Sequence, residues 1–315
     1  MKTATKPLSE IFADQRLLLS AVKSPAATMK VAVDAPAGAV PAVDPEYVWN
    51  RKTCSIAMDI ASGLLSKNWL LGGLPGAGKT EFIFQFCART GRPLVVVDCP
   101  AYSEPGPLFS SVEPDDKSKS GLRRIDGPVI RAYRMGGVLA LDEVTAFAPE
   151  LQLLLHAVLD RRPLLVPGSG ETVNPHPDLV IIATTNDAHG EDRMRYRGNY
   201  GLNAALESRF AQIKFEPDQE LIIAALQARV PSIKLEYIEH MLDLARSVQN
   251  SSAGLREFSF RQMVTAAKYL ALKPSATFED AIDVAYLSLK PASDRAAVQE
   301  LIKSIKLLHS SGKAK

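Results

Sequence analysis

The stretch GLPGAGKT, residues 73–80, decides the fold of this chain of 315 residues. It matches the pattern G-x-x-x-x-G-K-[ST], in which the backbone N–H groups of a glycine-rich loop surround a phosphate at the start of a helix. NWLLGG precedes the loop with the short apolar pattern of a buried strand, and KTEFIFQFCART follows it with the pattern of a helix. A strand, this loop and a helix in that order predict a nucleotide site in an α/β fold.

The side chains of the loop have separate expected roles. Lys79 is expected to bridge the β- and γ-phosphates of ATP, and Thr80 to ligate Mg²⁺ through its hydroxyl. The residues predicted to bind the nucleotide are Gly73, Leu74, Pro75, Gly76, Ala77, Gly78, Lys79 and Thr80. ATP and Mg²⁺ are therefore the expected cofactors.

A second motif, VLALDE, ends an apolar strand with two acids, Asp142 and Glu143. A carboxylate at the carboxyl end of a parallel strand lies in the crevice where such sheets bind ligands. Asp142 is expected to hold the Mg²⁺ shell, and Glu143 to polarise the water that attacks ATP. Because each motif requires the other, their joint presence predicts an ATP-hydrolysing enzyme.

Helix and strand patterns alternate from residue 46 to residue 215. Further buried strands are predicted at PLVVVDC, GGVLALDE, DLVIIATTN and AQIKF. With NWLLGG they predict a five-stranded parallel sheet between helices, an αβα core of the α/β class. One helix is predicted over PEYVWNRKTCSIAMDIASGLL, and another, beginning at Pro149, is expected to cover the sheet. The core-facing residues expected in this second helix are Leu151, Leu154, Leu155, Val158 and Leu159.

Two further regions flank the predicted core. Residues 1–45 are expected to be an arm or linker, because residues 21–45 are rich in Ala, Val and Pro without a regular period. Leu8, Ile11, Phe12 and Leu17 to Leu19 can form a short docking helix ahead of it. Residues 216–315 are predicted to form a helical lid of four or five helices. Their expected core-facing residues are Leu235, Ile238, Met241, Leu242 and Ala245; Phe260, Met263, Val264, Ala267 and Leu270; and Phe278, Ala281, Ile282, Ala285 and Leu289.

Three polar residues outside these motifs are candidates for the site. Asn186 ends the strand LVIIATTN and can orient the attacking water or sense the γ-phosphate, although an Asn after a strand is also a common turn residue. Arg209 in ALESRF can form a surface ion pair or reach the nucleotide of a neighbouring subunit. Arg261 in SFRQ, at the start of a helix, has either a structural or a functional role.

Composition argues against several classes of partner and site. The 37 Lys and Arg residues against 35 Asp and Glu give a net charge of +2, too small a global field to indicate nucleic acid or an anionic membrane as partner. Cys54, Cys87 and Cys99 form no CxxC pair, which favours a reduced compartment. No stretch approaches the roughly 18 apolar residues that a membrane span needs, so a cytoplasmic protein without a membrane segment is expected. The histidines show no metal-ligand spacing with each other or with the cysteines. They are His156, His176, His189, His240 and His309.

The ordered set GLPGAGKT, VLALDE, IIATTN, ALESRF and SFRQ, followed by a helical subdomain, resembles the AAA+ ATPases. The 43 residues between Asp98 and Asp142 leave room for an insertion in the second helix, and RRPLLVPGSGETVNPHPDLVIIATTN reads as a hairpin before the third core strand. Both features resemble the MoxR branch. Four stretches, VDPEYVWNRKTCSIAMDIASGLL, DGPVIRAYRMGGVLALDEV, NPHPDLVIIATTN and SFRQ, resemble the ATPase (small) subunit of aerobic cobaltochelatase and its stand-alone or phage-encoded relatives. This resemblance covers roughly residues 8–270.

The resemblance implies further roles and partners. By it, Arg209 is an arginine finger acting in trans, Asn186 the first sensor and Arg261 the second. It also implies a homo-oligomeric ring, usually a hexamer, which works in a chaperone-like manner beside a partner with a von Willebrand A domain. Metal insertion into a macrocycle is the narrow, chelatase version of this activity.

Three classes of function stay open on the sequence alone. The first is a motor that remodels or activates a partner protein through residues 110–128. The second is a nucleic-acid motor or loader that holds phosphates with basic side chains, and the third is a nucleotide-gated scaffold with little turnover. The basic residues concerned are Lys117, Lys119, Arg123, Arg124, Arg193, Arg195 and Arg197. Glu143 argues against the scaffold, because binding alone needs no water-activating carboxylate.

Overall fold

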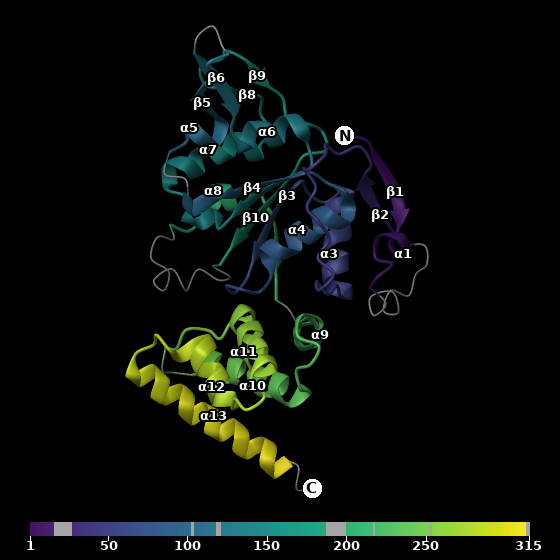
Figure 1. Cartoon of the computed structure of the whole chain (residues 1–315). Coiled ribbons are helices and arrows are strands. Elements are labelled where there is room, and N and C mark those ends of the chain that lie inside the picture. Colours follow the sequence, from purple (N-terminus) through teal and green to yellow (C-terminus); the bar gives the residue numbers. More distant parts are fainter. Residues whose placement is uncertain are drawn as a thin grey trace. The chain divides into compact units, whose positions relative to one another are not determined.

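The computed structural model describes residues 1–15, 27–101, 104–117, 121–186, 200–216, 218–251 and 254–312. They divide into two compact units, whose elements are labelled in Figure 1. The first unit comprises Met1–Asp44, Trp49–Leu74 and Lys79–Glu216, and the second comprises Pro45–Val48, Pro75–Gly78 and Pro217–Lys315. Each unit has its own buried apolar cluster.

The first unit contains a five-stranded sheet in the order β11-β3-β10-β7-β4. Its strands are β3 (Asn68–Gly72), β4 (Leu94–Asp98), β7 (Val138–Asp142), β10 (Val180–Thr185) and β11 (Ala211–Lys214). All four neighbouring pairs are parallel, which confirms the predicted sheet and fold class. All carboxyl ends of the strands therefore lie at one edge of the sheet.

Helices cover both faces of this sheet (Figure 1). On one side lie α3 (Arg51–Ser62) and α4 (Lys79–Thr90), and on the other α6 (Pro128–Met135) and α7 (Pro149–Leu159). Alternate strand residues such as Leu139, Leu141 and Ile181 pack into one cluster with α6 and α7. Successive side chains of a strand point to opposite faces of the sheet, and helices cover both faces. The strands are therefore buried on both sides, as their continuous apolar runs predict.

The helices α3 and α7 correct two expectations. The helix predicted from Pro45 begins only at Arg51, because the Asn50 side chain accepts a hydrogen bond from the Thr53 N–H at 2.8 Å and caps the first turn. The α7 residue Leu154 is 39% exposed, so it does not belong to the buried face predicted for this helix.

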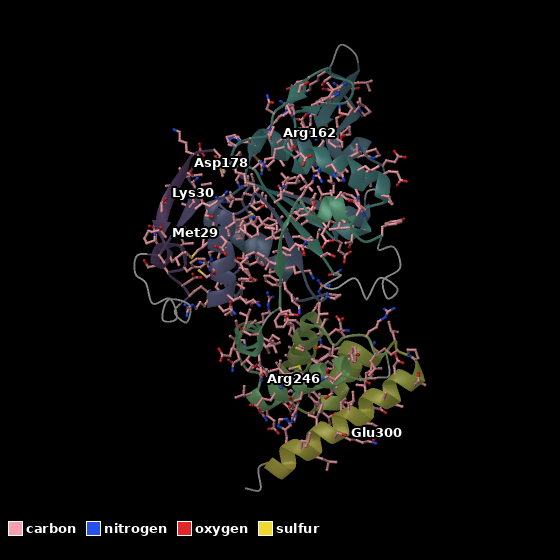
Figure 2. The ribbon with its side chains drawn as sticks, turned by 180° about the vertical axis from the view of Figure 1, so that it is seen from behind. Met29, Lys30, Arg162, Asp178, Arg246 and Glu300 are labelled. Atoms are coloured by element: carbon pink, nitrogen blue, oxygen red, sulfur yellow. The ribbon has the colours of Figure 1, made fainter. Side chains whose placement is uncertain are left out.

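The N-terminal segment is more regular than the predicted arm. The strands β1 (Thr3–Pro7) and β2 (Thr28–Ala32) pair antiparallel, and the short helix α1 (Leu8–Ile11) follows β1. Met29 is buried and Lys30 exposed (Figure 2). Phe12 packs edge-on against Trp49, with 4.9 Å between ring centroids. The extended arm is thus wrong for β2, whereas the predicted residues Leu17 to Leu19 lie outside the described residues.

Two hairpins extend from the first unit. The strands β5 (Ser110–Pro114) and β6 (Leu122–Asp126) pair between α5 (Gly106–Phe109) and α6, where the sequence predicts a polar loop. The strands β8 (Leu164–Leu165) and β9 (Thr172–Val173) form the hairpin predicted before β10. Arg134 joins the two hairpins, since its guanidinium contacts Asp126 at 2.8 Å and Glu171 at 2.7 Å.

The described part of the second unit is helical. It contains α9 (Gln219–Arg229), α10 (Leu235–Gln249), α11 (Phe260–Leu272), α12 (Phe278–Ile282), a π-helical turn (Asp283–Leu287) and α13 (Ala292–Gly312). The helical pattern after Phe215 is confirmed. Leu289 is fully exposed, however, because the π turn ends the predicted helical face before it. Within the described residues, no helix combines the length and apolar character needed to cross a membrane.

Candidate functional site

Lys79 lies at the centre of a polar cluster at the carboxyl edge of the sheet. Its ammonium donates to the backbone carbonyls of Gly73 and Leu74, each at 2.8 Å, and to Oδ1 of Asn186 at 3.0 Å. The residue is only 6% exposed. A buried ammonium needs oxygen partners, and ATP phosphates supply the same kind of acceptor. The structure thus brings together Lys79 and Asn186, which the sequence separates by more than 100 residues.

Asp142 connects the end of β7 with the start of α4. Its Oδ1 accepts one hydrogen bond from the Thr80 hydroxyl at 2.8 Å and another from the Thr184 hydroxyl at 2.6 Å. Thr80 and Asp142 therefore lie in contact, as expected for two residues that share one magnesium shell. The sequence analysis did not single out Thr184. The signal that could have found it is the period of two along β10, which puts Thr184 on the same face as Asn186.

Glu143 adopts an unusual backbone conformation immediately after β7. Its φ of 54° and ψ of 52° lie in the left-handed region, which a residue with a Cβ rarely occupies. The backbone N–H donates to the Thr184 hydroxyl at 2.9 Å, and the carboxylate accepts a hydrogen bond from the Asn186 side-chain amide. The carboxylate is thereby directed toward Asn186 and, through it, toward Lys79.

The loop between β3 and α4 needs glycine for steric reasons. A Cβ on Gly73 would lie 2.4 Å from the Phe215 carbonyl oxygen, and Gly78 has a φ of 92°. Pro75, Gly76, Ala77 and Gly78 complete the loop and belong to the second unit.

The side chains at this edge fit Mg²⁺ and ATP. Mg²⁺ prefers hard oxygen ligands and usually binds one or two carboxylates together with substrate phosphates. The Thr80 hydroxyl and the Asp142 carboxylate, already 2.8 Å apart, are ligands of that kind. Burial and the nearby charges of Asp142 and Asp98 raise the pKa of the Cys99 thiol, so it stays protonated and is no competing soft ligand. Within the described residues, no group of three or more His, Cys, Asp or Glu side chains could hold another metal.

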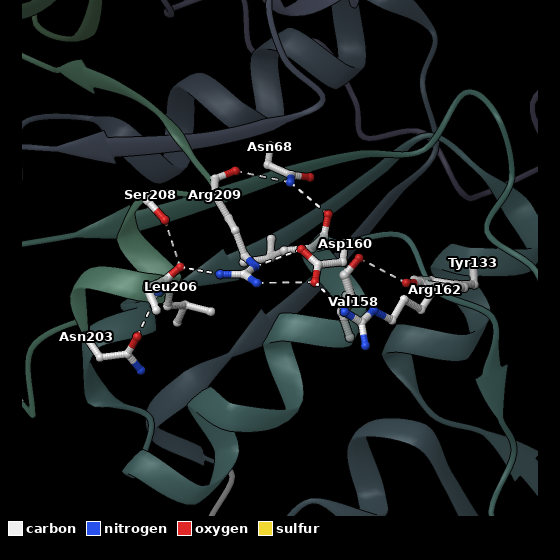
Figure 3. Close-up of polar contacts among 11 residues, drawn as sticks. Asn68, Tyr133, Val158, Asp160, Arg162, Asn203, Leu206, Ser208 and Arg209 are labelled. Carbon is white, nitrogen blue, oxygen red and sulfur yellow. Dashed lines mark hydrogen bonds and ion pairs between the residues drawn. The ribbon is translucent and has the colours of Figure 1, made fainter.

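Arg209 lies at the opposite, amino edge of the sheet. It precedes β11, and its carbonyl accepts a hydrogen bond from Asn68, the first residue of β3, at 3.2 Å. Its guanidinium forms a two-pronged ion pair with Asp160 at 2.7 Å and 3.3 Å (Figure 3). This pair lowers the pKa of Asp160 and raises the pKa of Arg209. The structure does not bring Arg209 to the Lys79 cluster.

Arg261 lies in the first turn of α11, in the second unit. The helix begins with a capping box, in which Ser259 and Gln262 bond each other's backbone N–H groups. Within this unit, Gly76 approaches the same cap, because a Cβ added there would lie 3.1 Å from Cβ of Ser259. The Arg261 side chain is exposed.

Four of the basic residues considered for nucleic-acid binding, Lys119, Arg193, Arg195 and Arg197, lie outside the described residues.

Comparison with known proteins agrees with this geometry. Residues 68–210 match the AAA domain (dynein-related subfamily). Uncharacterized proteins of Staphylococcus haemolyticus and Staphylococcus saprophyticus are each 34% identical over 155 residues, which cover 48% of this chain. The matches span only 56% of each of these relatives, little more than half of their length. An uncharacterized protein of Staphylococcus epidermidis is 27% identical over 67% of this chain and 80% of its own length.

Crystal structures of NtrX from Brucella abortus align with TM-scores of 0.48, both for the ADP complex, at 19% identity, and for the ATP complex, at 16% identity. The alignments cover 76% and 81% of this chain and 53% and 67% of those chains. The segment that is similar to the AAA domain, residues 68–210, is also the segment that supplies the hydrogen-bonded residues Lys79, Thr80, Asp142, Glu143 and Asn186.

Proposed function

We propose that this protein is a Mg²⁺-dependent ATPase that assembles into a ring, expected to be a hexamer, and uses hydrolysis to remodel or activate a partner protein. The observation that supports it best is the single network joining Lys79, Asn186 and Glu143 on one side to Thr80 and Asp142 on the other. Such a network contains both a phosphate-binding cation and a water-activating base. A simple nucleotide-binding fold would need only the first.

The proposed reaction is the transfer of the γ-phosphoryl group of ATP to water. Glu143 takes a proton from the water while the water oxygen bonds to the γ-phosphorus, and the bond between that phosphorus and the bridging oxygen of ADP breaks. Lys79 stabilises the negative charge on the β- and γ-phosphates, and Thr80 and Asp142 hold Mg²⁺. Mg²⁺, when bound, supplies further positive charge against the phosphate oxygens. Asn186 orients the carboxylate of Glu143 by the hydrogen bond already present.

Arg209 supports action between subunits. The strand β3 separates it from its own phosphate loop, and five residues of strand span about 13–17 Å. An arginine at that edge cannot reach the nucleotide of its own chain, but it can approach the nucleotide of a neighbouring copy. In this proposal Arg209 is the arginine finger, Asn186 the first sensor and Arg261 the second.

The two hairpins of the first unit are the proposed contact with the partner protein. The hairpin β5–β6 lies in the insertion, and β8–β9 is the hairpin before β10, on which the resemblance to the MoxR branch rests. We infer that these hairpins deliver subunit movement to a partner with a von Willebrand A domain, in a chaperone-like role or, in the narrow version, in metal insertion. Stimulation of ATP hydrolysis by such a protein supports this inference. Stimulation by single-stranded DNA with a steep salt dependence favours a nucleic-acid motor instead.

The experiment that tests the ATPase is steady-state hydrolysis measured against protein concentration, with mass photometry of the same samples with and without ATP. Specific activity is expected to rise as the ring forms. Glu143→Gln is expected to abolish turnover while ATP binding and assembly persist. Glu150→Gln, at an exposed glutamate of α7, is the matched control. A wild-type protein that binds ATP and assembles but hydrolyses nothing would make the protein a nucleotide-gated scaffold.

A further inference from the structure

Thr184 is a buried threonine that touches both acids of the site. It is 1% exposed, and its hydroxyl donates to Oδ1 of Asp142 at 2.6 Å. The Thr184 hydroxyl oxygen also accepts a hydrogen bond from the backbone N–H of Glu143 at 2.9 Å. One side-chain atom thus connects the proposed magnesium ligand with the proposed base.

The sheet register explains why this residue reaches both acids. The strands β10 and β7 run parallel with Ala183 beside Leu141, so the next residue of β10 lies beside Asp142. Side chains two positions apart in a strand share a face, so Thr184 and Asn186 lie on the same face of the sheet, beside the two acids at the end of β7. Asn186 bonds the Glu143 carboxylate, whereas Thr184 bonds its backbone. Glu143 is therefore held at two separate points by one strand.

The backbone of Glu143 is where the Thr184 hydroxyl matters most. A non-glycine residue in the left-handed region is strained and persists only where its surroundings hold it. The Glu143 φ of 54° is such a case, and its N–H is fixed by Thr184. A hydroxyl provides a donor and an acceptor at once, which no apolar side chain of the same shape does.

The same hydroxyl also sets the orientation of Asp142. The hydroxyls of Thr80, on α4, and Thr184, on β10, both donate to Oδ1 of Asp142, at 2.8 Å and 2.6 Å. Within the described part of the chain, no donor lies on Oδ2. This pattern leaves Oδ2 available for the water shell of Mg²⁺.

We propose that Thr184 is a positioning residue for ATP hydrolysis, which orients the Glu143 base and the Asp142 carboxylate through one shared hydroxyl. The proposal rests on the proposed ATPase function. Thr184 touches neither nucleotide nor water in this account and acts through the two acids. Removal of its hydroxyl therefore affects the chemical step more than nucleotide binding, for which Lys79 is the principal side chain.

The test compares Thr184→Val, Thr184→Ser and Thr90→Val with the wild-type full-length chain. Thr184→Val keeps the shape and loses the hydroxyl, and Thr184→Ser keeps the hydroxyl. Thr90 is the matched control, because it is 1% exposed and, among the described residues, its hydroxyl donates only to a backbone carbonyl of its own helix, that of Phe86 at 2.6 Å. It lies about 15 Å along α4 from Thr80. The readouts are kcat and KM for ATP, the Mg²⁺ concentration for half-maximal activity, and the melting temperature.

Thr184→Val is expected to lower kcat about 10- to 100-fold, the loss expected from hydrogen bonds to a charged group, while KM for ATP changes little. It is also expected to raise the Mg²⁺ requirement. Thr184→Ser is expected to restore most of kcat, and Thr90→Val to leave kcat at the wild-type value. A Thr184→Val protein whose kcat and Mg²⁺ requirement equal those of Thr90→Val overturns the proposal.

Two further outcomes have distinct meanings. If Thr184→Val does not fold, Thr184→Ala and Thr184→Ser are compared, and equal kcat values for these two overturn the proposal because they differ in the hydroxyl. If the wild-type chain itself hydrolyses no ATP under ring-forming conditions, the proposed function fails first. The measurement of the wild-type protein therefore separates the two failures.

Discussion

At the carboxyl edge of the sheet, side chains from three strand ends contact one another, whereas at the amino edge Arg209 is held by Asp160 on the far side of the same strands. The first edge contains a buried cation, Lys79, together with the proposed metal ligand Asp142 and the proposed base Glu143 in a single chain. The second contains a guanidinium that cannot reach its own chain's nucleotide, since strand β3 lies between them. In the proposed ring, one chain therefore carries most of the ATPase site at its carboxyl edge and presents Arg209 at its amino edge to another copy.

The largest effect is expected at the carboxyl edge, for Lys79→Ala. This change removes the buried ammonium that bridges the loop carbonyls and Asn186, so both phosphate binding and charge stabilisation are lost. We expect turnover to fall by more than about 10³-fold. Phosphate release and binding of a fluorescent ATP analogue measure it. Lys67→Ala, at an amino-edge lysine that bonds the Pro177 carbonyl, is the control, and equal turnover in both variants would refute the phosphate loop.

Arg209→Ala is expected to have the next largest effect. Removing an arginine finger costs on the order of 10³-fold in turnover, because the finger stabilises charge in the transition state. ATP binding by the isolated chain is expected to persist, since the Lys79 cluster is intact. Equilibrium ATP binding and single-turnover hydrolysis separate these two quantities. If Arg209→Ala lost ATP binding to the same extent as turnover, the carboxyl edge alone would not account for nucleotide binding.

Mixing the two variants sharpens the comparison. In a mixed ring, an Arg209→Ala subunit contributes an intact carboxyl edge, and a Lys79→Ala subunit contributes an intact Arg209. Some interfaces then contain both, so the mixture is expected to hydrolyse ATP faster than either variant alone. A mixture no more active than the sum of its components, although mass photometry shows mixed rings, would place both residues in one chain's site.

Asn68→Ala tests the amino edge through stability. The Asn68 amide donates to the carbonyls of Leu159, at 3.0 Å, and Arg209, at 3.2 Å, and so joins the ends of α7 and the segment before β11 to β3. We expect the free energy of unfolding to fall by about 1–3 kcal/mol. Arg209→Ala, which keeps its carbonyl and loses only a partly exposed ion pair, is expected to destabilise the protein less than Asn68→Ala. Chemical denaturation of both variants decides this, and a reversed order would contradict it.

Sequence patterns predict the carboxyl edge well because its motifs are local. The loop residues 73–80 and the pair Asp142 and Glu143 have fixed spacings, and buried parallel strands are apolar runs. Thr184 could not be predicted as a site residue, because threonine is common in strands and the sequence does not show which hydroxyl forms a hydrogen bond with which acid. The left-handed backbone of Glu143 is equally hidden, because it depends on a neighbouring strand.

Long-range pairing explains the other differences. The strand β2 lies in a stretch rich in Ala and Val, and it becomes a strand only because β1 pairs with it from about 25 residues away in the chain. The hairpin β5–β6 has both faces largely exposed, so it lacks the alternation that marks a half-buried strand. The partner of Arg209 is Asp160, separated by 49 residues, which no motif predicts.

Asp160→Asn is expected to have the smallest effect and bears most directly on how the amino edge works. The carboxylate fixes both prongs of the Arg209 guanidinium, and the amide keeps one acceptor without the charge. Since the pair is at the solvent-exposed surface, we expect little change in stability and a fall in turnover of about tenfold or less. Arg162→Ala is the control, because Arg162 contacts the same carboxylate at 3.2 Å from an exposed position. Faster turnover in Asp160→Asn would mean that Asp160 restrains Arg209 instead of orienting it for a neighbouring subunit.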